Sequence, residues 1–288
     1  MYLWRRLAEP RWLIANEEPL RSRTRERLAI IERPGWKRAL LEVACRSRKQ
    51  ARDLVKEFDG RIERLPRGWL ERLAKEKRKP LRIGKRLIIM RAKDKREAGS
   101  FPYSLILPAG AAFGTGEHAT TAMSLRLLEQ VTRGWKRGWS MVDLGTGSGI
   151  LALAAKCFGA KHVVAIDVDP IAIATATENA RLNKIDNLDF QLADARRWNF
   201  PARLALSEVE RVDIVTANLF SELLIEVLPK VKRSRWLILS GALREQEKEL
   251  VRALQRNKID IAQVRRRGKW IAILGKNGFD ANDRYRKI

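Results

Sequence analysis

The sequence predicts an α/β protein whose large carboxy-terminal domain holds a mostly parallel sheet, preceded by a small α+β domain. From about residue 104 onward, short apolar runs alternate with helical patterns, as in sheets whose parallel strands are joined by helices. A glycine cluster at 145–149 directly follows one apolar run. Acidic residues follow the next two runs, at the strand ends where open α/β sheets bind their ligands.

Length and composition exclude several classes of protein. The chain has 288 residues, 45% of them hydrophobic, which allows one large core and a smaller domain. No window approaches 18 consecutive apolar residues, so we expect no membrane span. The first residues lack a secretory apolar region and cleavage site, which predicts a cytoplasmic protein. Two cysteines and two histidines are too few for a disulfide scaffold or the usual metal clusters, so no metal is expected.

The basic charge is concentrated in the first third of the chain. The whole sequence carries 59 Lys and Arg against 34 Asp and Glu, a net charge of +25. Residues 1–100 contain 30 basic and 14 acidic side chains, or +16, and the remaining residues contain 29 and 20, or +9. Such a field attracts phosphate backbones or acidic partners. A solvated, arginine-biased surface explains it equally well, because no RNA-binding motif accompanies the charge.

The first hundred residues divide into two segments. In residues 1–35, tryptophans and prolines are scattered among arginines without a steady period. We therefore expect a basic extension that need not be ordered, apart from a short helix within 20–31. Residues 36–100 predict a small α+β domain and its linker. Its expected strands are 39–44, 61–65 and 81–90, and its expected helices are 47–58 and 69–77.

Residues 101–288 form the predicted large domain. Pro170 opens one of its helices, as proline does at a first helical position. The last two apolar runs, 259–264 and 270–274, are expected to close the sheet as an antiparallel pair. The other expected strands are 141–144, 162–166, 188–192, 212–217 and 236–240, and the expected helices are 150–158, 170–182, 221–231 and 243–254.

Three glycines follow the strand 141–144. Gly145, Gly147 and Gly149 stand in the order Asp-Leu-Gly-Thr-Gly-Ser-Gly, and they let the backbone turn sharply and approach a ligand closely. The spacing Gly-x-Gly-x-Gly does not fit the dinucleotide pattern Gly-x-Gly-x-x-Gly. No Gly-Lys-Ser/Thr follows, which excludes a phosphate-binding loop of the nucleotide-hydrolase kind. Taken alone, the cluster is also compatible with a plain tight turn.

Two carboxylates follow the next two strands. Asp167 comes 22 residues after Gly145, about where a ribose-binding acid falls in a β-α-β unit. Asp169, directly before Pro170, suits a helix cap better than Asp167 does. Asp194 is a candidate acceptor for an adenine amino group, although a solvated turn aspartate is an equal alternative. The pattern favours an adenosine-containing ligand.

Together these residues resemble the class I S-adenosylmethionine-dependent methyltransferases. One stretch is more specific: residues 112–121, Ala-Phe-Gly-Thr-Gly-Glu-His-Ala-Thr-Thr, are similar to the AFGTGxHxTT signature of the ribosomal protein L11 methyltransferases of the PrmA type. Residues 80–89, 217–219 and 239–242 resemble three further motifs of that family. The resemblance extends from about residue 69 to residue 274, about seventy per cent of the chain.

The resemblance implies a fold, an activity and a set of site residues. It implies a Rossmann-like domain with a mostly parallel seven-stranded sheet, S-adenosyl-L-methionine as cofactor, and methylation of lysine side chains and an N-terminal amine of a ribosomal protein, L11. The family's cofactor contacts fall on Thr121, Gly145, Asp167 and Asn218. The full cofactor set that we predict is Thr121, Gly145, Gly147, Gly149, Asp167, Asp194 and Asn218, and the catalytic set is Asn218, Thr121 and His118, the last without an assigned role.

The resemblance is weakest at the amino terminus. The family's substrate-binding domain is a ferredoxin-like fold of two β-α-β halves, and only residues 36–66 read as such a half. We therefore expect a reduced substrate-recognition domain, which leaves the substrate open.

Three other functions remain open at this point. A basic first third with interleaved tryptophans can contact rRNA and stack bases, which would suit an RNA methyltransferase, and another protein-lysine methyltransferase of the same class is a further possibility. Asn218 is followed by Leu-Phe rather than by the Pro-Pro-Tyr of base-modifying relatives, which favours a protein substrate. A cofactor-binding assembly factor without activity is a third reading, which the presence of Thr121, Asp167 and Asn218 disfavours.

Overall fold

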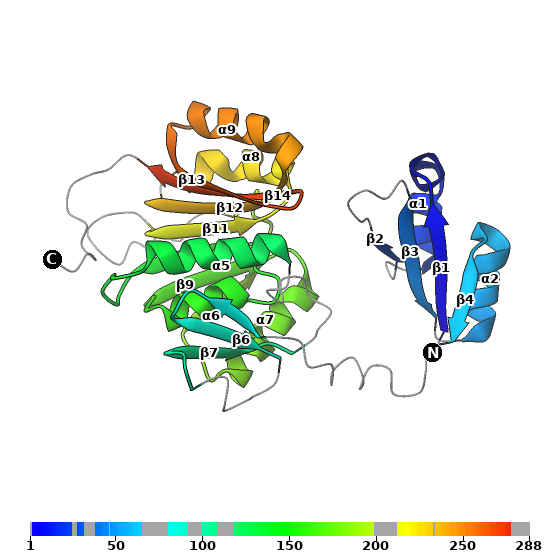
Figure 1. Ribbon diagram of the computed structural model, residues 1–288, viewed down its shortest axis with the longest axis horizontal. Helices are drawn as coiled ribbons and strands as arrows, with labels where there is room; N and C mark the ends of the chain where they lie inside the picture. The colour runs from blue at the N-terminus through cyan, green and yellow to red at the C-terminus, as the bar shows by residue number, and fades with distance from the viewer. Residues whose placement is uncertain are drawn as a thin grey trace. The chain divides into compact units, whose positions relative to one another are not determined.

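The structure, a computed structural model, describes residues 2–24, 28–31, 38–45, 47–64, 80–91, 99–108, 118–198, 212–232 and 234–277. The chain divides into an amino-terminal unit, Met1–Lys77, and a carboxy-terminal unit, Arg78–Ile288, both drawn in Figure 1. The observed boundary differs from the predicted ones after residues 35 and 100. Residues on both sides of 35 share one core, and the strands between residues 81 and 106 pack into the core of the larger unit.

The amino-terminal unit is a complete β-α-β-β-α-β fold. Its four strands form an antiparallel sheet in the order β2-β3-β1-β4, the ferredoxin-like arrangement. Its core is made of apolar side chains from all parts of the unit, with Trp4, Leu20 and Leu41 fully buried. The elements are β1 (Tyr2–Ala8), α1 (Pro10–Thr24), β2 (Leu28–Ile31), β3 (Ala39–Cys45), α2 (Arg48–Phe58) and β4 (Arg61–Arg64).

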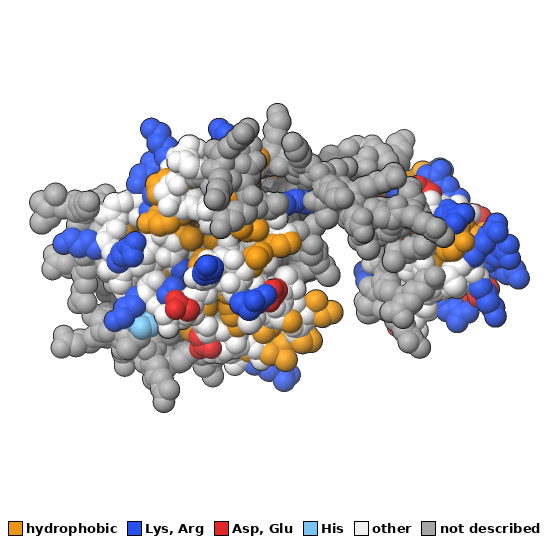
Figure 2. Space-filling model, turned by 90° about the horizontal axis from the view of Figure 1, so that it is seen from below, with side chains coloured by type: hydrophobic (Ala, Val, Ile, Leu, Met, Phe, Trp, Pro, Cys, Tyr) orange, Lys and Arg blue, Asp and Glu red, His pale blue; other side chains and the backbone are white. Residues whose placement is uncertain are grey.

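The predictions of an irregular extension over 1–35 and of a reduced amino-terminal domain are therefore wrong. Two adjacent arginines hide the regular strand β1, although both pair with carboxylates: Arg5 on neighbouring strands, and Arg6 with Asp59 at the end of α2. Arg5 Nε lies 2.6 Å from Glu42 Oε1 on β3, and Arg5 also pairs with Glu63 on β4. Such cross-strand charge pairs stabilise a sheet. Figure 2 shows this mixture of basic and acidic side chains on the surface of the unit.

The helix expected within residues 20–31 is also wrong, because α1 ends at Thr24 and β2 follows. Pro10 begins α1, which accounts for one of the prolines that suggested irregular structure. The predicted elements at 39–44, 47–58 and 61–65 are confirmed to within one residue at each end. The helix expected at 69–77 lies outside the described residues.

The carboxy-terminal unit contains the predicted seven-stranded sheet. Its order is β10-β9-β8-β11-β12-β14-β13, and the first five of these strands run parallel. The last two form the expected antiparallel pair, with β14 beside β12. The strands are β8 (Ser140–Leu144), β9 (His162–Asp167), β10 (Leu188–Leu192), β11 (Ile214–Asn218), β12 (Trp236–Leu243), β13 (Ile259–Arg267) and β14 (Trp270–Asn277).

Helices cover both faces of this sheet. Successive strand residues point to opposite faces, so Met141 packs into one hydrophobic cluster and Val142 into the other. The first cluster includes side chains of α5 and α6, and the second includes side chains of α8 and α9. Figure 1 shows how these helices are arranged around the sheet. The helices are α5 (Ala119–Val131), α6 (Ile150–Cys157), α7 (Pro170–Leu182), α8 (Ser221–Val231) and α9 (Glu247–Arg256). Among the described helices, none is long and apolar enough to cross a bilayer.

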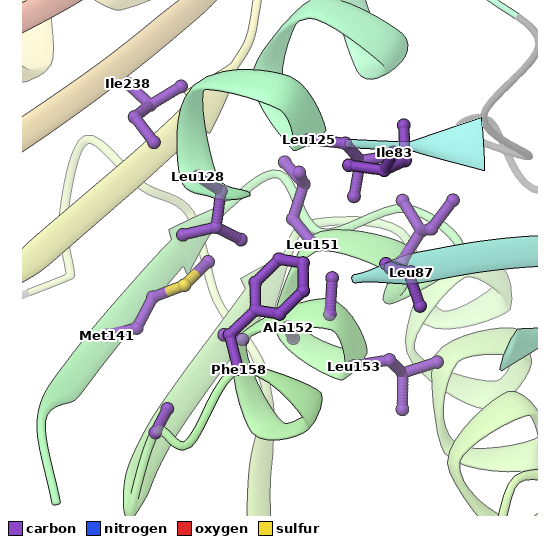
Figure 3. Packing of buried hydrophobic residues seen from close by; sticks show 14 of the residues in the cluster. Ile83, Leu87, Leu125, Leu128, Met141, Leu151, Ala152, Leu153, Phe158 and Ile238 are labelled. Carbon is purple, nitrogen blue, oxygen red and sulfur yellow. The ribbon is translucent and has the colours of Figure 1, made fainter. Parts of the chain in front are cut away.

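A small three-stranded sheet covers the α5–α6 side of the unit. It consists of β5 (Leu81–Ile83), β6 (Leu87–Met90) and β7 (Tyr103–Ile106). The single strand predicted at 81–90 is a hairpin, because Gly84 adopts a positive φ of 55° in the turn. Figure 3 shows Leu87 of this sheet near Leu125 of α5 and Phe158 after α6. The hairpin thus holds α5, the helix that carries one side of the site described below.

Candidate functional site

The site lies where the order of the parallel strands reverses. From β8 the chain proceeds to β9 and β10 on one side, and then to β11 and β12 on the other side. The loops that leave the adjacent strands β8 and β11 therefore diverge, and ligands of open α/β sheets bind at this point. The predicted site residues lie at or just after the ends of β8, β9, β10 and β11, or at the start of α5.

The glycine loop after β8 needs its glycines. Gly145, Gly147 and Gly149 have φ angles of 71°, 55° and 79°, in the left-handed region that side-chain-bearing residues rarely adopt. A Cβ atom on Gly149 would lie 2.9 Å from the Cβ of Ala176 on α7. The backbone of this loop is therefore not covered by side chains of its own at these three positions, and it packs closely against α7. A ligand can approach such a backbone closely.

Asp143, in strand β8, fixes the position of this loop by hydrogen bonds. The side chain is fully buried, and it accepts hydrogen bonds from Thr146 Oγ1 at 2.7 Å and from Thr216 Oγ1 at 2.5 Å. Burial raises the pKa of Asp143 to about 6, and the two hydroxyl groups oppose that rise. The carboxylate thus ties the glycine loop to strand β11.

Asp167 is joined to the same loop. Its Oδ2 accepts from Gly147 N at 2.9 Å, and its Oδ1 accepts from Asp169 N at 3.0 Å. Each oxygen keeps a further lone pair, so the carboxylate can still accept hydrogen bonds from ribose hydroxyls. Asp169 caps α7 by accepting from Ile171 N at 2.8 Å, which confirms that Asp169 rather than Asp167 is the cap.

Two exposed apolar side chains flank the carboxylate. Val168 follows β9 and is 71% exposed, and Leu192 ends β10 and is 61% exposed. Apolar side chains beside a few polar groups are typical of small-molecule sites. Together with Asp167 and the bare glycine loop, they fit an adenosine-containing ligand.

Asp194 lies close by but is already paired. The backbone of Ala193 donates to Asp167 O at 2.9 Å, which brings the segment after β10 beside the end of β9. Arg196 forms a chelating pair with the Asp194 carboxylate, with Nη2 at 2.7 Å from Oδ2. These hydrogen bonds lower the pKa of Asp194 to about 2. Asp194 is therefore an ionised hydrogen-bond acceptor. A ligand that binds to its carboxylate must share it with the guanidinium group of Arg196.

The other side of the site is built by Asn218 and Thr121. Asn218 ends β11, and its Nδ2 lies 3.4 Å from Thr121 Oγ1 in the first turn of α5. Thr121 is fully buried and Asn218 is half-buried. Among the described residues, nothing donates a hydrogen bond to Asn218 Oδ1, so this oxygen remains available as an acceptor.

Leu219 connects Asn218 to the glycine loop. Its side chain occupies the space that a Cβ on Gly145 would need. Its backbone N–H donates to Ser240 O at 3.0 Å, and its carbonyl lies so close to Gly241 that no side chain would fit there. Gly241 has a φ of 101°. The structure therefore brings together Thr121, Asn218, the glycine loop and Asp167 through direct contacts.

His118 lies at the edge of this group and makes structural contacts. Its Nδ1 is 2.7 Å from Thr120 Oγ1, and its ring meets Trp270 edge-on with 5.0 Å between the centroids. Burial and the charge of Lys269 lower its pKa, so the imidazole is neutral near pH 7. These contacts fix the start of α5 against β14. Residues 112–117, the rest of the signature loop, lie outside the described residues.

Sequence reasoning missed the neighbours that shape the site. Leu219 and Gly241 were part of quoted motifs, but their mutual contact links segments 22 positions apart and has no local signal. Phe220, which directly follows Leu219, is 72% exposed. An exposed aromatic two positions after Asn218 could have been noted from the sequence as a substrate-facing candidate.

A sequence profile for the ribosomal protein L11 methyltransferases (PrmA) matches residues 36–278. The chain belongs to this family. It is 34% identical over 203 residues to the ribosomal protein L11 methyltransferase of Dictyoglomus thermophilum, and 36% identical over 201 residues to that of Lacticaseibacillus paracasei. These matches cover 69% and 67% of this chain, and 63% and 59% of the relatives. The chain thus spans about three fifths of the length of the curated relatives.

A solved structure gives the same result for the fold. The ribosomal protein L11 methylase of Lactobacillus delbrueckii subsp. bulgaricus is 28% identical, with a TM-score of 0.58, and the match covers 69% of this chain and 99% of that one. The predicted family and the Rossmann-like fold are therefore confirmed. All predicted site residues of this L11 methyltransferase family member lie inside the matched range of 36–278.

Proposed function

We propose that the protein transfers methyl groups from S-adenosyl-L-methionine to amino groups of a ribosomal protein, with L11 as the substrate that the family favours. Lysine side chains and an N-terminal amine are the acceptors in this proposal. The observation that carries it is the contact between Asn218 and Thr121 directly beside the glycine loop. Family membership supports the reaction.

The cofactor fits the residues that line one side of the site. Gly145, Gly147 and Gly149 leave room for a ligand against the main chain, and Asp167 offers acceptors for ribose hydroxyls. When bound, S-adenosylmethionine supplies a methyl group on a positively charged sulfur, which needs no further activation. The protein's task is then to hold an amine in line with that methyl group and to exclude water, a proximity effect.

The acceptor amine must first lose a proton. A lysine with a pKa near 10.4 lies about 3.4 units above pH 7, which corresponds to roughly 4.6 kcal/mol. A partly desolvated site lowers that cost. Asn218 Oδ1 can accept a hydrogen bond from the neutral amine while Nδ2 holds Thr121. In this proposal Asn218 orients the nitrogen lone pair, and Thr121 fixes the orientation of Asn218.

Labelled methyl transfer to ribosomal subunits tests the proposal. The protein is incubated with methyl-labelled S-adenosylmethionine and purified subunits, and the products are digested with protease or with nuclease. The proposal predicts that protease releases the label and nuclease does not. Release by nuclease alone would assign the activity to RNA, and the absence of any label would favour the non-enzymatic assembly factor.

A further inference from the structure

The antiparallel hairpin β13–β14 carries arginines with different surroundings on its two faces. Arg265 Nη2 donates to Gln130 Oε1 of α5 at 2.7 Å, so Arg265 lies on the α5 face. Arg267 shares that face, because strand residues two apart point the same way. Arg266 points to the opposite face, where its Nε lies 2.8 Å from Glu247 Oε2 of α9.

The arginines on the α5 face are not neutralised. Among the ion pairs of the described residues, none involves Arg126, Arg265 or Arg267. Glu129, the acid of α5, is turned towards Arg86 and Arg133 instead. Burial lowers the pKa of Arg126, and the charges of Arg267 and Arg265 lower it further. The charges of Arg265 and Arg267 on β13 therefore reach Arg126 on α5.

Arg265 also has an unused donor. Its Nε is buried and has no hydrogen-bond partner within the described part of the chain. Beside it, the amide groups of Gln130 and Gln263 are joined at 3.0 Å. Arg126, Gln130, Gln263, Arg265 and Arg267 form a surface that we call the α5–β13 face.

This face leads to the edge of the site. Arg267 pairs with Trp270 across the hairpin, and the Trp270 ring contacts His118 at the start of α5. Lys269, in the turn between these strands, is close enough to His118 to lower its pKa. His118 is three positions before Thr121 in the sequence. The positive charge thus continues from β13 to the carboxyl edge of the sheet.

A phosphate backbone is the partner that matches this arrangement. Guanidinium groups bind phosphate oxygens with paired hydrogen bonds. Residues two apart on a strand are about 7 Å apart, so Arg265 and Arg267 form a row rather than a pocket. A row suits a polymer with repeated charges better than a single small anion. Gln130 and Gln263 can both donate and accept, and the half-buried Trp270 can offer an aromatic edge or face to a base.

We propose that the α5–β13 face binds the phosphate backbone of RNA beside the methyl-transfer site. In this arrangement a ribosomal protein on its RNA is presented with its amine near Asn218. That second statement rests on the proposed function, whereas RNA binding by the face does not.

RNA binding by the full-length protein tests the proposal. The probe is a short fluorescein-labelled RNA hairpin, and its fluorescence anisotropy is followed at several salt concentrations without S-adenosylmethionine. The test variant is Arg265→Gln/Arg267→Gln. The control is Arg252→Gln/Arg256→Gln, which removes the same charge from exposed positions on α9, on the other face of the sheet. Circular dichroism confirms that both variants are folded.

The test variant should bind the hairpin at least about tenfold more weakly, and the slope of log K against log salt should fall by about two. The control should resemble the wild type, and Arg265→Lys/Arg267→Lys should keep the slope. Methylation of free ribosomal protein by the test variant should be unchanged, so failure here is distinguishable from failure of the proposed function.

Three results would overturn the proposal. The first is that the wild type does not bind the RNA hairpin. The second is that the test and control variants lose equal RNA affinity. The third is that the test variant keeps its RNA affinity but no longer binds a polyglutamate peptide that the wild type binds. The last result would assign the face to an acidic protein partner.

Discussion

Asp143 is a buried carboxylate whose hydrogen-bond partners are two neutral hydroxyl groups. Its pKa of about 6 is above the ordinary value of 3.8, so the native state holds an extra proton between these pH values. The unfolded chain has already lost that proton, and the free energy of unfolding therefore decreases as pH rises through this interval. Above about pH 6 the full cost of the buried charge is present.

Asp143→Asn should remove this pH dependence. Between pH 4 and pH 7, we expect the free energy of unfolding of the wild type to fall by about 2 kcal/mol relative to that of the variant. Urea unfolding of both proteins at several pH values measures this difference. A constant difference over this range would show that Asp143 titrates normally.

The polar residues of the candidate site could be proposed from the sequence, whereas the contacts of the residues packed around them could not. Asn218, Thr121 and Asp167 stand in motifs or at strand ends, where their polar groups have an evident use. Leu219 acts by filling the space beside Gly145, and Gly241 acts by having no side chain near the Leu219 carbonyl. Such effects depend on distances between strands, which the sequence does not express.

At the level of secondary structure elements, Glu129 joins α5 to the small sheet. Its side chain is 4% exposed and pairs with Arg86 of the β5–β6 turn and with Arg133. Arg86 also donates to the Glu129 carbonyl at 2.6 Å and lies over the Phe158 ring at 4.2 Å. This cluster holds in place the helix that bears Thr121.

Glu129→Ala should lower the free energy of unfolding by about 3 kcal/mol, because it leaves a partly buried guanidinium without its carboxylate. Glu178→Ala is the matched control, since Glu178 pairs with Arg181 on the exposed face of α7, and it should cost less than about 1 kcal/mol. Denaturant unfolding compares the two. Equal losses would mean that the Arg86 cluster does not support α5.

Elements with clear periodicity could be predicted, and the exceptions have physical causes. α5 was not predicted because most of its side chains are buried, so no polar stripe marks a helical period. β1 was missed because its adjacent arginines interrupt the apolar pattern, and their ion pairs with distant carboxylates have no local signal. The antiparallel pair β13–β14 was found because apolar runs flank a short charged turn.

For the molecule as a whole, the two units have separate hydrophobic cores. Part of the basic excess of the first third is neutralised within the amino-terminal unit, where Arg5, Arg6 and Arg38 pair with carboxylates. The α5–β13 face has no such partners in the described part of the chain. Total charge therefore indicates an anionic partner less well than the distribution of unpaired charge does.

Separate cores predict two unfolding transitions in scanning calorimetry of the full chain. S-adenosylmethionine at about 100 times its dissociation constant should stabilise the carboxy-terminal unit by about 2.7 kcal/mol. Only the transition of that unit should move to higher temperature. A shift of both transitions together would show that the two units unfold as one. A shift of the amino-terminal transition alone would show that the cofactor binds to the amino-terminal unit.

Methyl transfer to purified ribosomal protein L11 by wild type and by Asn218→Ala, both saturated with S-adenosylmethionine, tests the central claim most directly. The account predicts that the wild type methylates amino groups of the substrate. It also predicts that Asn218→Ala is slower by about a hundredfold or more, the cost of a misplaced reactant, while circular dichroism shows the fold of the wild type. Equal rates for the two proteins, or no transfer by the wild type, would contradict it.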